Sequence, residues 1–371
     1  MDSLTHLVLG GAIGAALAPA GQRRAAILAG AALNTVPDFD VLLLPLFTHD
    51  PVQLMTWHRS FLHSVFLLPL IGWLVWWLCR VRGKRVNAAP ARWFWLIQAC
   101  LLSHPLMDAC TVYGTSLLWP LDVRPTMWSN FFIIEPSFML WLLLGCIVAW
   151  CIPDKPWGRR GARGGLALAA CVLVGSLVSK ALVDRQADRA LAAMGLAHAP
   201  RFSTPMPFST LLWRVVAMTP GGYVDGERSV FDRQPMVFRG HPSNTQALAH
   251  AKATGIPAVT RLDWFNHGFM RAQVQDRRLV LSDLRMGLDP DYTFNFAVAE
   301  QHDGGWQAIA PEQIQVPLPI SGASGFRRLV GAVWHRTWHP GDTPLRDAIV
   351  APEIQAAAAN PEGTPASSAS K

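Results

Sequence analysis

Apolar stretches fill most of the first 184 residues, and they constrain the fold more than any other feature of the chain. They cover residues 4–19, 25–47, 61–79, 93–119, 131–152 and 164–183. The last four are each near the ~20 residues that a helix needs to cross a bilayer, whereas the first two are shorter or interrupted by polar residues. The pattern predicts an α-helical membrane bundle of about six transmembrane helices.

The later part of the chain has a different composition. The whole chain is 51% hydrophobic and only 15% charged, but residues 195–350 carry scattered charge and many Pro and Gly. Short alternating segments there predict strands at Leu211–Met218, Val259–Trp264, Phe269–Gln275, Leu279–Leu284 and Tyr292–Val298, with a helix at Asn244–Thr254. We therefore expect a transmembrane domain over residues 1–185, a β-rich domain over 195–350 and a disordered Ala-, Pro- and Ser-rich tail over 351–371.

Basic residues gather in the short connections between apolar stretches, at residues 23–24, 80–92 and 155–163. Such loops face the cytoplasm in bacterial membrane proteins. Six spans then place both termini and the β-rich domain on the outer side, so we expect a multi-pass membrane protein whose β-rich domain would be periplasmic in a bacterium. Because the net charge of +7 is concentrated in these loops, it gives no reason to expect nucleic-acid binding.

Seven His and Asp side chains lie in or beside the apolar stretches, where ionisable groups are costly and tend to be functional. They are His6, Asp38, Asp40, His58, His63, His104 and Asp108. At ~1.5 Å per helical residue, all seven reach the outer third of a bundle about 30 Å thick. Imidazole and carboxylate suit divalent metals. We predict a site for one or two ions, with zinc as the first expectation.

The spacing of these residues suggests separate roles. His104 and Asp108 share one helical face at i and i+4. Pro37 interrupts helix geometry, so Asp38 and Asp40 can both turn inward; one would ligate and the other take a proton. Arg59 suits an anionic substrate, and pairing with Asp50 or lipid headgroups is an equal alternative. A single membrane histidine is more often an interhelical hydrogen-bond partner, so the metal hypothesis depends on the whole set converging.

Several of these residues form a pattern that resembles a known family. The pattern is Thr5-His6, Pro37-Asp38-x-Asp40, His58-Arg59-x3-His63-Ser64, Ser103-His104-x3-Asp108 and Tyr113-Gly114-Thr115. Over roughly residues 1–185 it resembles the bacterial inner-membrane metal-dependent hydrolases of the YdjM-like type, also described as LexA-regulated or LexA-binding. The resemblance implies a membrane hydrolase with a divalent metal, and LexA as a partner by the family's description alone.

The order His, Asp, His, His-x3-Asp is also similar to the zinc-dependent phospholipase C and single-strand nuclease superfamily, which implies phosphodiester hydrolysis. This sequence lacks a second downstream His-x3-Asp or His-x3-Glu, so we expect one or two ions here. The leading hypothesis is a hydrolase of an ester or phosphodiester in a lipid or lipid-linked substrate, with Asp38, Asp40 and Arg59 in the chemistry. The alternative is a non-enzymatic membrane protein whose polar cluster is structural or handles ions, with the β-rich domain as the binding part.

Overall fold

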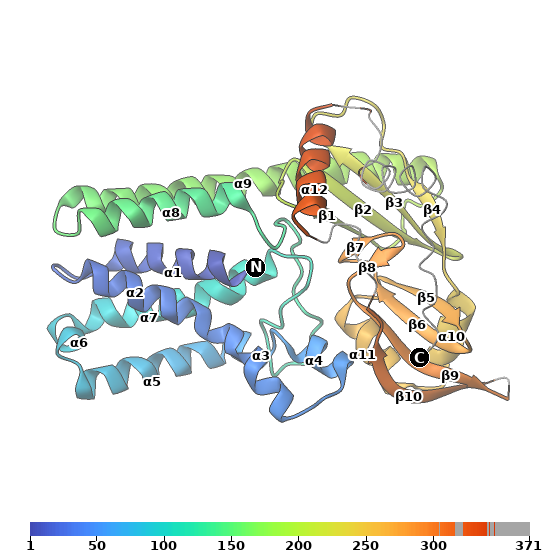
Figure 1. Ribbon diagram of the computed structural model, residues 1–371, viewed down its shortest axis with the longest axis horizontal. Helices are drawn as coiled ribbons and strands as arrows, with labels where there is room; N and C mark the ends of the chain where they lie inside the picture. Colours follow the sequence, from blue (N-terminus) through green and yellow to red (C-terminus); the bar gives the residue numbers. More distant parts are fainter. Residues whose placement is uncertain (304, 316–321, 340, 342–344, 346–371) are drawn as a thin grey trace, which may run out of the picture.

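The apolar stretches fold into helices that form one end of an elongated molecule, and the later residues form a β-rich part at the other end (Figure 1). This computed structural model describes residues 1–303, 305–315, 322–339, 341 and 345. A helical first region followed by a β-sheet-rich second region confirms the expected order. The tail predicted to be disordered, residues 351–371, lies outside the described residues.

The bundle is built from long helices joined by short connections. They are α1 (Ser3–Leu17), α2 (Arg23–Thr35), α5 (Leu67–Arg82), α6 (Lys84–Ala88), α7 (Pro90–Ala109), α8 (Pro136–Cys151) and α9 (Pro156–Ala193). Three of them begin with proline, at Pro90, Pro136 and Pro156, where the missing N–H leaves no helical bond unmade. Glu135 caps α8 by accepting a hydrogen bond from the Ser137 N–H.

Glycines bring the backbones of α1 and α2 into direct contact. A Cβ atom on Gly10 would lie 2.1 Å from the carbonyl oxygen of Gly30, and one on Gly14 would lie 2.1 Å from that of Ala26. Small residues allow this close approach between membrane helices. As a result His6, one turn before Gly10, lies opposite Asn34 of α2.

The prediction of six transmembrane helices is not supported. Within the described residues, two helical segments are long and apolar enough to cross a membrane, Arg23–Leu46 and Pro156–Ala193, or up to three if the bent pair Pro51–His63 and Leu67–Arg82 is one span. The helices α1 and α8 are apolar but have only 15 and 16 residues. The stretch 93–119 is shorter as a helix than as an apolar run, because α7 ends at Ala109 and the chain continues as a loop.

Between α2 and α5 the chain makes a series of short helical turns at the end of the bundle nearest the β-rich part. They are η1 (Val36–Phe39), α3 (Asp40–Leu43), η2 (Leu44–Leu46), α4 (Pro51–Trp57) and η3 (Phe61–His63). Pro37, Pro45 and Pro51 each lack the N–H that a continuous helix needs. The changes of direction turn Asp40 and His63 inward, where both are fully buried.

In the part of the chain that the structure describes, the β-rich half contains two four-stranded antiparallel sheets and a two-stranded one. The first sheet has the order β1 (Arg201–Pro205), β2 (Leu212–Thr219), β3 (Gly222–Ser229), β4 (Arg239–Pro242). The second has the order β10 (Gly305–Gln313), β9 (Asn295–His302), β6 (Arg278–Asp283), β5 (Met270–Gln275), and β7 (Gly287–Leu288) pairs with β8 (Asp291–Tyr292). The helices are α10 (Thr245–Ala253), α11 (Pro257–Phe265) and α12 (Gly322–Trp338).

Four strand predictions and the helix prediction match observed elements, since β2, β5, β6, β9 and α10 lie where they were expected. The strand predicted at Val259–Trp264 is wrong, because these residues belong to α11. Pro257 occupies its first turn, and Val259, Leu262 and Phe265 are buried at helical spacing.

The two parts of the molecule share a hydrophobic core. Val52 and Met55 of α4 and Tyr113 of the loop after α7 pack in one cluster with residues of α10, α11 and the second sheet. A buried ion pair lies beside it: Arg285 binds Asp283 and donates hydrogen bonds from Nη1 to the carbonyl oxygens of Tyr113 (2.9 Å) and Phe265 (3.2 Å). The β-rich part therefore holds the loop that follows α7.

Candidate metal centre

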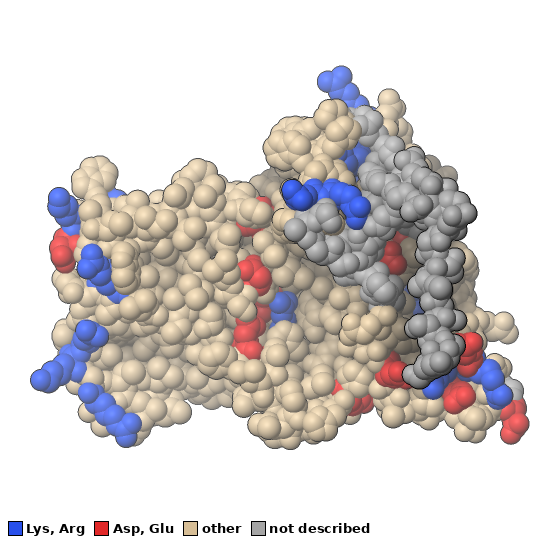
Figure 2. Space-filling model, viewed as in Figure 1, with Lys and Arg blue, Asp and Glu red and all other residues tan. Residues whose placement is uncertain are grey.

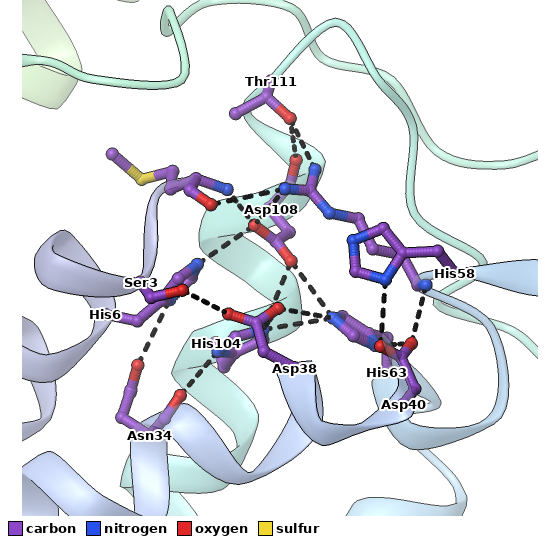
Figure 3. A network of polar contacts seen from close by, with 12 residues as sticks. Ser3, His6, Asn34, Asp38, Asp40, His58, His63, His104, Asp108 and Thr111 are labelled. Atoms are coloured by element: carbon purple, nitrogen blue, oxygen red, sulfur yellow. Dashed lines mark hydrogen bonds and ion pairs between the residues drawn. The ribbon is translucent and has the colours of Figure 1, made fainter. Parts of the chain in front are cut away.

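A group of buried His and Asp side chains lies where α1, α7 and the short turns after α2 meet (Figure 3). Four of them, Asp38, His63, His104 and Asp108, each offer one donor atom, and these four atoms all lie within 4.8 Å of one another. His63 and Asp108 are buried, and Asp38 has 19% of its side chain exposed. The structure therefore contains a candidate metal-binding site made of two imidazoles and two carboxylates.

The distances between these donor atoms match tetrahedral coordination. Nε2 of His63 and Nε2 of His104 lie 3.1 Å apart, and each is 3.2–3.3 Å from Oδ2 of Asp108. Oδ1 of Asp38 is 3.4 Å from Nε2 of His104 and 3.9 Å from Nε2 of His63. A tetrahedral ion with bonds of about 2.0–2.1 Å separates its ligands by about 3.3 Å. Among the described residues, Oδ2 of Asp108 has no hydrogen-bond partner, so a cation would satisfy it.

The orientation of His104 is fixed by the backbone of α2. Its Nδ1 lies 2.6 Å from the carbonyl oxygen of Asn34, which can only accept, so Nδ1 carries the proton. The lone pair of a neutral ring is then on Nε2, directed at the other donors. A backbone carbonyl behind the ligating ring is a common arrangement around metal-bound histidine.

Asp40 lies behind His63 and outside the four-residue group. Its Oδ2 is 3.5 Å from Nδ1 of His63 and accepts a hydrogen bond from the backbone N–H of Arg59 at 2.9 Å. Its Oδ1 is 2.9 Å from Nδ1 of His58. Since both oxygens are engaged with other side chains and backbone, Asp40 is placed to orient His63 and His58.

His6 lies on the other side of Asp108. Its Nε2 is 3.1 Å from Oδ1 of Asp108, and its Nδ1 is 3.2 Å from Oδ1 of Asn34. The amide nitrogen of Asn34 donates to Cys100 and Ser103, which identifies Oδ1 as the acceptor for His6. The rings of His6 and His104 are stacked with centroids 3.7 Å apart. Asn34 thus supports two histidines at once.

Arg59 is the buried cation beside the group. Its Nη2 lies 3.2 Å from Oδ1 of Asp108, which also contacts the α-amine of Met1, and its Nη1 donates to Oγ1 of Thr111 at 2.9 Å. The guanidinium lies 5.0 Å from the centre of the Tyr113 ring. Its backbone has a φ of +63°, a strained conformation for a residue with a side chain. That turn lets the Arg59 N–H bind Asp40 while its side chain reaches Asp108.

The Tyr113 side chain is fixed from both parts of the molecule. Its hydroxyl donates to the carbonyl oxygen of Met55 at 2.7 Å, and its ring packs edge-on against His58 and Phe265. Burial raises the pKa of the Tyr113 phenol, so the hydroxyl remains a donor. Tyr113 therefore connects the β-rich core to Arg59.

The centre reaches the molecular surface on the Asp38 side. The hydroxyl of Ser3 lies 3.5 Å from Oδ2 of Asp38 in an exposed contact. Figure 2 shows a small group of acidic side chains, with a basic one beside it, on a surface otherwise almost free of charge between the far end of the bundle and the β-rich part.

The first 186 residues, half of the chain, match the family model described as YdjM inner membrane protein, and the match includes the whole centre. The chain belongs to the YdjM inner membrane protein family. It is therefore a protein of an inner-membrane family with candidate membrane-spanning helices. No curated protein and no solved structure matches the chain.

In this YdjM-family chain the structure gathers four of the seven His and Asp residues selected from the sequence around one point. His6, Asp40 and His58 contact the four from outside, and Arg59 contacts Asp108. Sequence reasoning missed Asn34 and Arg285, and it placed Tyr113 in the family pattern without foreseeing its supporting role. The sequence feature that could have identified Asn34 was a lone amide side chain in an apolar helix. Nothing near Arg285 in the sequence indicated its role, because its contacts are distant in sequence.

Proposed function

We propose that the protein is a metal-dependent hydrolase of the inner membrane that cleaves an ester or phosphodiester in a lipid or lipid-linked substrate. The observation that carries this proposal is the convergence of Asp38, His63, His104 and Asp108 donor atoms within 4.8 Å. Buried donors without a cation between them would be costly. A set of two imidazoles and two carboxylates suits Zn²⁺ and similar divalent ions.

The bound ion would supply Lewis acidity, polarising the scissile bond and making water a better nucleophile at neutral pH. Asp38, His63, His104 and Asp108 would hold it. The carbonyl oxygen of Asn34 keeps the Nε2 lone pair of His104 directed at the site, and the Asp40 carboxylate lies 3.5 Å from Nδ1 of His63, on the side of that ring away from the site. Asp38 is the ligand on the exposed side, so a substrate would approach past it.

A proton can be handled by the His58–Asp40 pair. Nδ1 of His58 donates to Oδ1 of Asp40 at 2.9 Å, and this partly exposed ring has its Nε2 available to accept a proton from water or return it to a leaving group. This assignment differs from the expectation that Asp38 or Asp40 takes the proton directly, because both oxygens of Asp40 are already engaged.

Arg59 is placed to bind an anionic oxygen of the substrate. Its Nε atom has no hydrogen-bond partner among the described residues, and the guanidinium is held by Thr111, Asp108 and the Tyr113 ring. A fixed guanidinium binds phosphate or a developing oxyanion through paired donors. Because it also contacts Asp108, Arg59 keeps substrate charge next to the metal ligands.

The location of the centre favours a lipid substrate. It lies at the end of the bundle, and the neighbouring turns expose large apolar side chains: Phe39, Val41, Leu42, Leu46 and Phe47. An apolar surface beside a polar site suits a molecule with a hydrocarbon tail and a polar headgroup. The basic loops at the opposite end of the bundle support a periplasmic location for the centre and the β-rich part.

The test uses the full chain purified in lipid nanodiscs. Metal content is measured by mass spectrometry, and hydrolysis is screened on phosphatidylethanolamine, phosphatidylglycerol, cardiolipin and a chromogenic phosphodiester, with and without a chelator. His104→Ala and Asp108→Ala should lose both bound metal and activity. His49→Ala, which removes an exposed histidine outside the group, is the matched control and should retain both.

The results separate the possible failures. A wild-type protein without stoichiometric Zn, Mn, Fe or Co would remove the metal site and the mechanism together. Stoichiometric metal with no hydrolysis of any substrate would leave a metal-binding membrane protein without the proposed chemistry. Activity that survives both the chelator and His104→Ala would assign hydrolysis to another part of the chain.

A further inference from the structure

A stripe of large apolar side chains runs along the exposed face of α12. The residues are spaced four apart, which places them on one side of the helix. They are Phe326, Val330, Trp334 and Trp338, with exposed fractions of 52, 38, 67 and 45%. The neighbouring Arg327 and His335 are also exposed. Folded proteins rarely leave such a contiguous apolar surface in water unless it binds something.

The opposite face of α12 is already used. Leu329 and Val333 pack against Met206 and Leu212 of the β-rich part, and Arg336 forms a buried ion pair with Asp232. That face attaches the middle of the helix to the β-rich part. At the two ends of the stripe, the Phe326 ring also contacts Phe208 and the Trp338 ring stacks on Phe231, with centroids 4.8 Å apart. Because the four side chains keep 38–67% of their surface exposed despite these ring contacts, most of the stripe is not covered by the described residues.

The position of α12 points to the membrane. Figure 1 shows it running across the direction of the bundle helices, on the side of the β-rich part that faces the bundle. Ring contacts link its start to the end of the bundle: the Phe326 and Phe208 rings lie 5.4 Å apart, and Phe208 and Phe132 lie 5.9 Å apart. Phe132 lies just before α8 begins, so the stripe continues the apolar surface of the bundle end.

Charges on α9 mark the edge of the hydrocarbon at the same level. Residues 164–179 of α9 contain no charged side chain, and Lys180, Asp184 and Arg185 follow. Nζ of Lys180 donates to the carbonyl oxygen of Ser203 at 2.9 Å, which places β1 beside this boundary. Phe208 follows β1 by three residues and contacts Phe326, so α12 starts at headgroup level.

We propose that α12 is an interfacial helix whose aromatic stripe enters the lipid headgroup layer of the membrane that the bundle spans. Trp and Phe are favoured at this depth, and an exposed Arg327 beside them suits lipid phosphates. Embedding this helix holds the β-rich part against the bilayer surface, next to the opening of the candidate centre. This membrane contact of α12 does not depend on whether the protein is a hydrolase.

The experiment measures lipid contact at single positions of the full chain. The six cysteines are replaced, and Trp334→Cys or Val330→Cys is labelled with a nitroxide in nanodiscs of phosphatidylethanolamine and phosphatidylglycerol that hold one copy each. Collisions with lipid-soluble oxygen and with a water-soluble nickel chelate are compared. Gln307→Cys, on exposed β10, is the matched control. Oxygen collisions should exceed nickel collisions several-fold at 334 and 330, and the order should reverse at 307.

Each other outcome overturns the proposal. Nickel collisions that dominate at 334 and 330 would show a water-facing helix. A label protected from both reagents, and released by deleting residues 346–371, would assign the stripe to the end of this chain. Dipolar broadening that appears only when two copies share a disc would assign it to a second copy. Because Trp334 is 67% exposed, its replacement should not prevent folding.

Discussion

Adding one methyl group at Gly10 should disrupt the candidate centre without touching any proposed ligand. The Cβ of Gly10→Ala would lie 2.1 Å from the Gly30 carbonyl oxygen and 2.5 Å from Cβ of Asn34. Ordinary contact begins near 3.4 Å, so α1 and α2 must separate by about 1.3 Å. The clash is with backbone, which cannot rotate away. Overpacking of this kind costs about 1–3 kcal/mol of folding stability.

The displacement acts on the centre through Asn34. Its carbonyl oxygen lies 2.6 Å from Nδ1 of His104, and a shift of about 1.3 Å would exceed hydrogen-bond distance. Its side chain also holds His6. Losing a partner behind a ligating histidine typically weakens metal binding by about 10- to 100-fold. We therefore expect Gly10→Ala to lower zinc affinity by that factor and to lower the unfolding temperature.

The matched control is Gly11→Ala in the same helix. A Cβ at Gly11 would lie 3.4 Å from Sγ of Cys146 and 3.5 Å from Ile27, both ordinary contacts. This variant should bind metal like the wild type and unfold at the same or a slightly higher temperature, because Ala favours helix over Gly. Both variants are measured by zinc titration and thermal unfolding in nanodiscs. Equal zinc affinity in the two variants would refute the link from helix contact through Asn34 to His104.

Three further predictions address the carboxylate behind the site, the β-rich clamp and the topology. Asp40→Asn should weaken zinc binding by about 10- to 100-fold because it alters the contact behind His63, while Ser3→Ala should have little effect; competition with a fluorescent chelator measures both. Arg285→Met should lower the free energy of unfolding by about 3–5 kcal/mol, since it leaves Asp283 buried without its partner. Denaturant titration measures this loss, and Arg277→Met, which replaces an exposed arginine, is the control variant that should lose much less. Reporter fusions after residues 86 and 158 should give cytoplasmic activity and a fusion after residue 124 periplasmic activity; the reverse pattern would refute the orientation.

Much of the helical half was predictable because apolar runs and their spacing are local signals. Helices formed where the runs were found, and the His and Asp residues stood out because charge is costly there. The prediction of six membrane-spanning helices failed because every apolar run was taken to be a helix that crosses the membrane. Val112, Tyr113 and Leu117 are apolar because they are buried in a loop, two of them against the β-rich part, and not because they face lipid.

The strand error has a similar cause. Val259–Trp264 contains residues with high β propensity. The segment nevertheless forms α11, because Pro257 starts the helix and Val259, Leu262 and Phe265 are buried at helical spacing. The β propensity of single residues is a weak guide to secondary structure where tertiary contacts determine which face of the segment is buried. The supporting contacts of the centre were hidden for the same reason, since Asn34 and His104 are 70 residues apart and Tyr113 and Arg285 are 172 apart.

The shared core makes the β-rich part a structural component of the centre. Tyr113 lies under the Arg59 guanidinium, and its carbonyl oxygen is held by Arg285. If residues 195–350 were absent, the Tyr113 ring would lose Phe265 and Phe294, and Val52 and Met55 would be exposed. Arg59 would then lack a fixed support, although its partners Asp108 and Thr111 would remain. The residues that would bind metal all lie in the family-matched region, but the position of the cation beside them depends on contacts made by the second half of the chain.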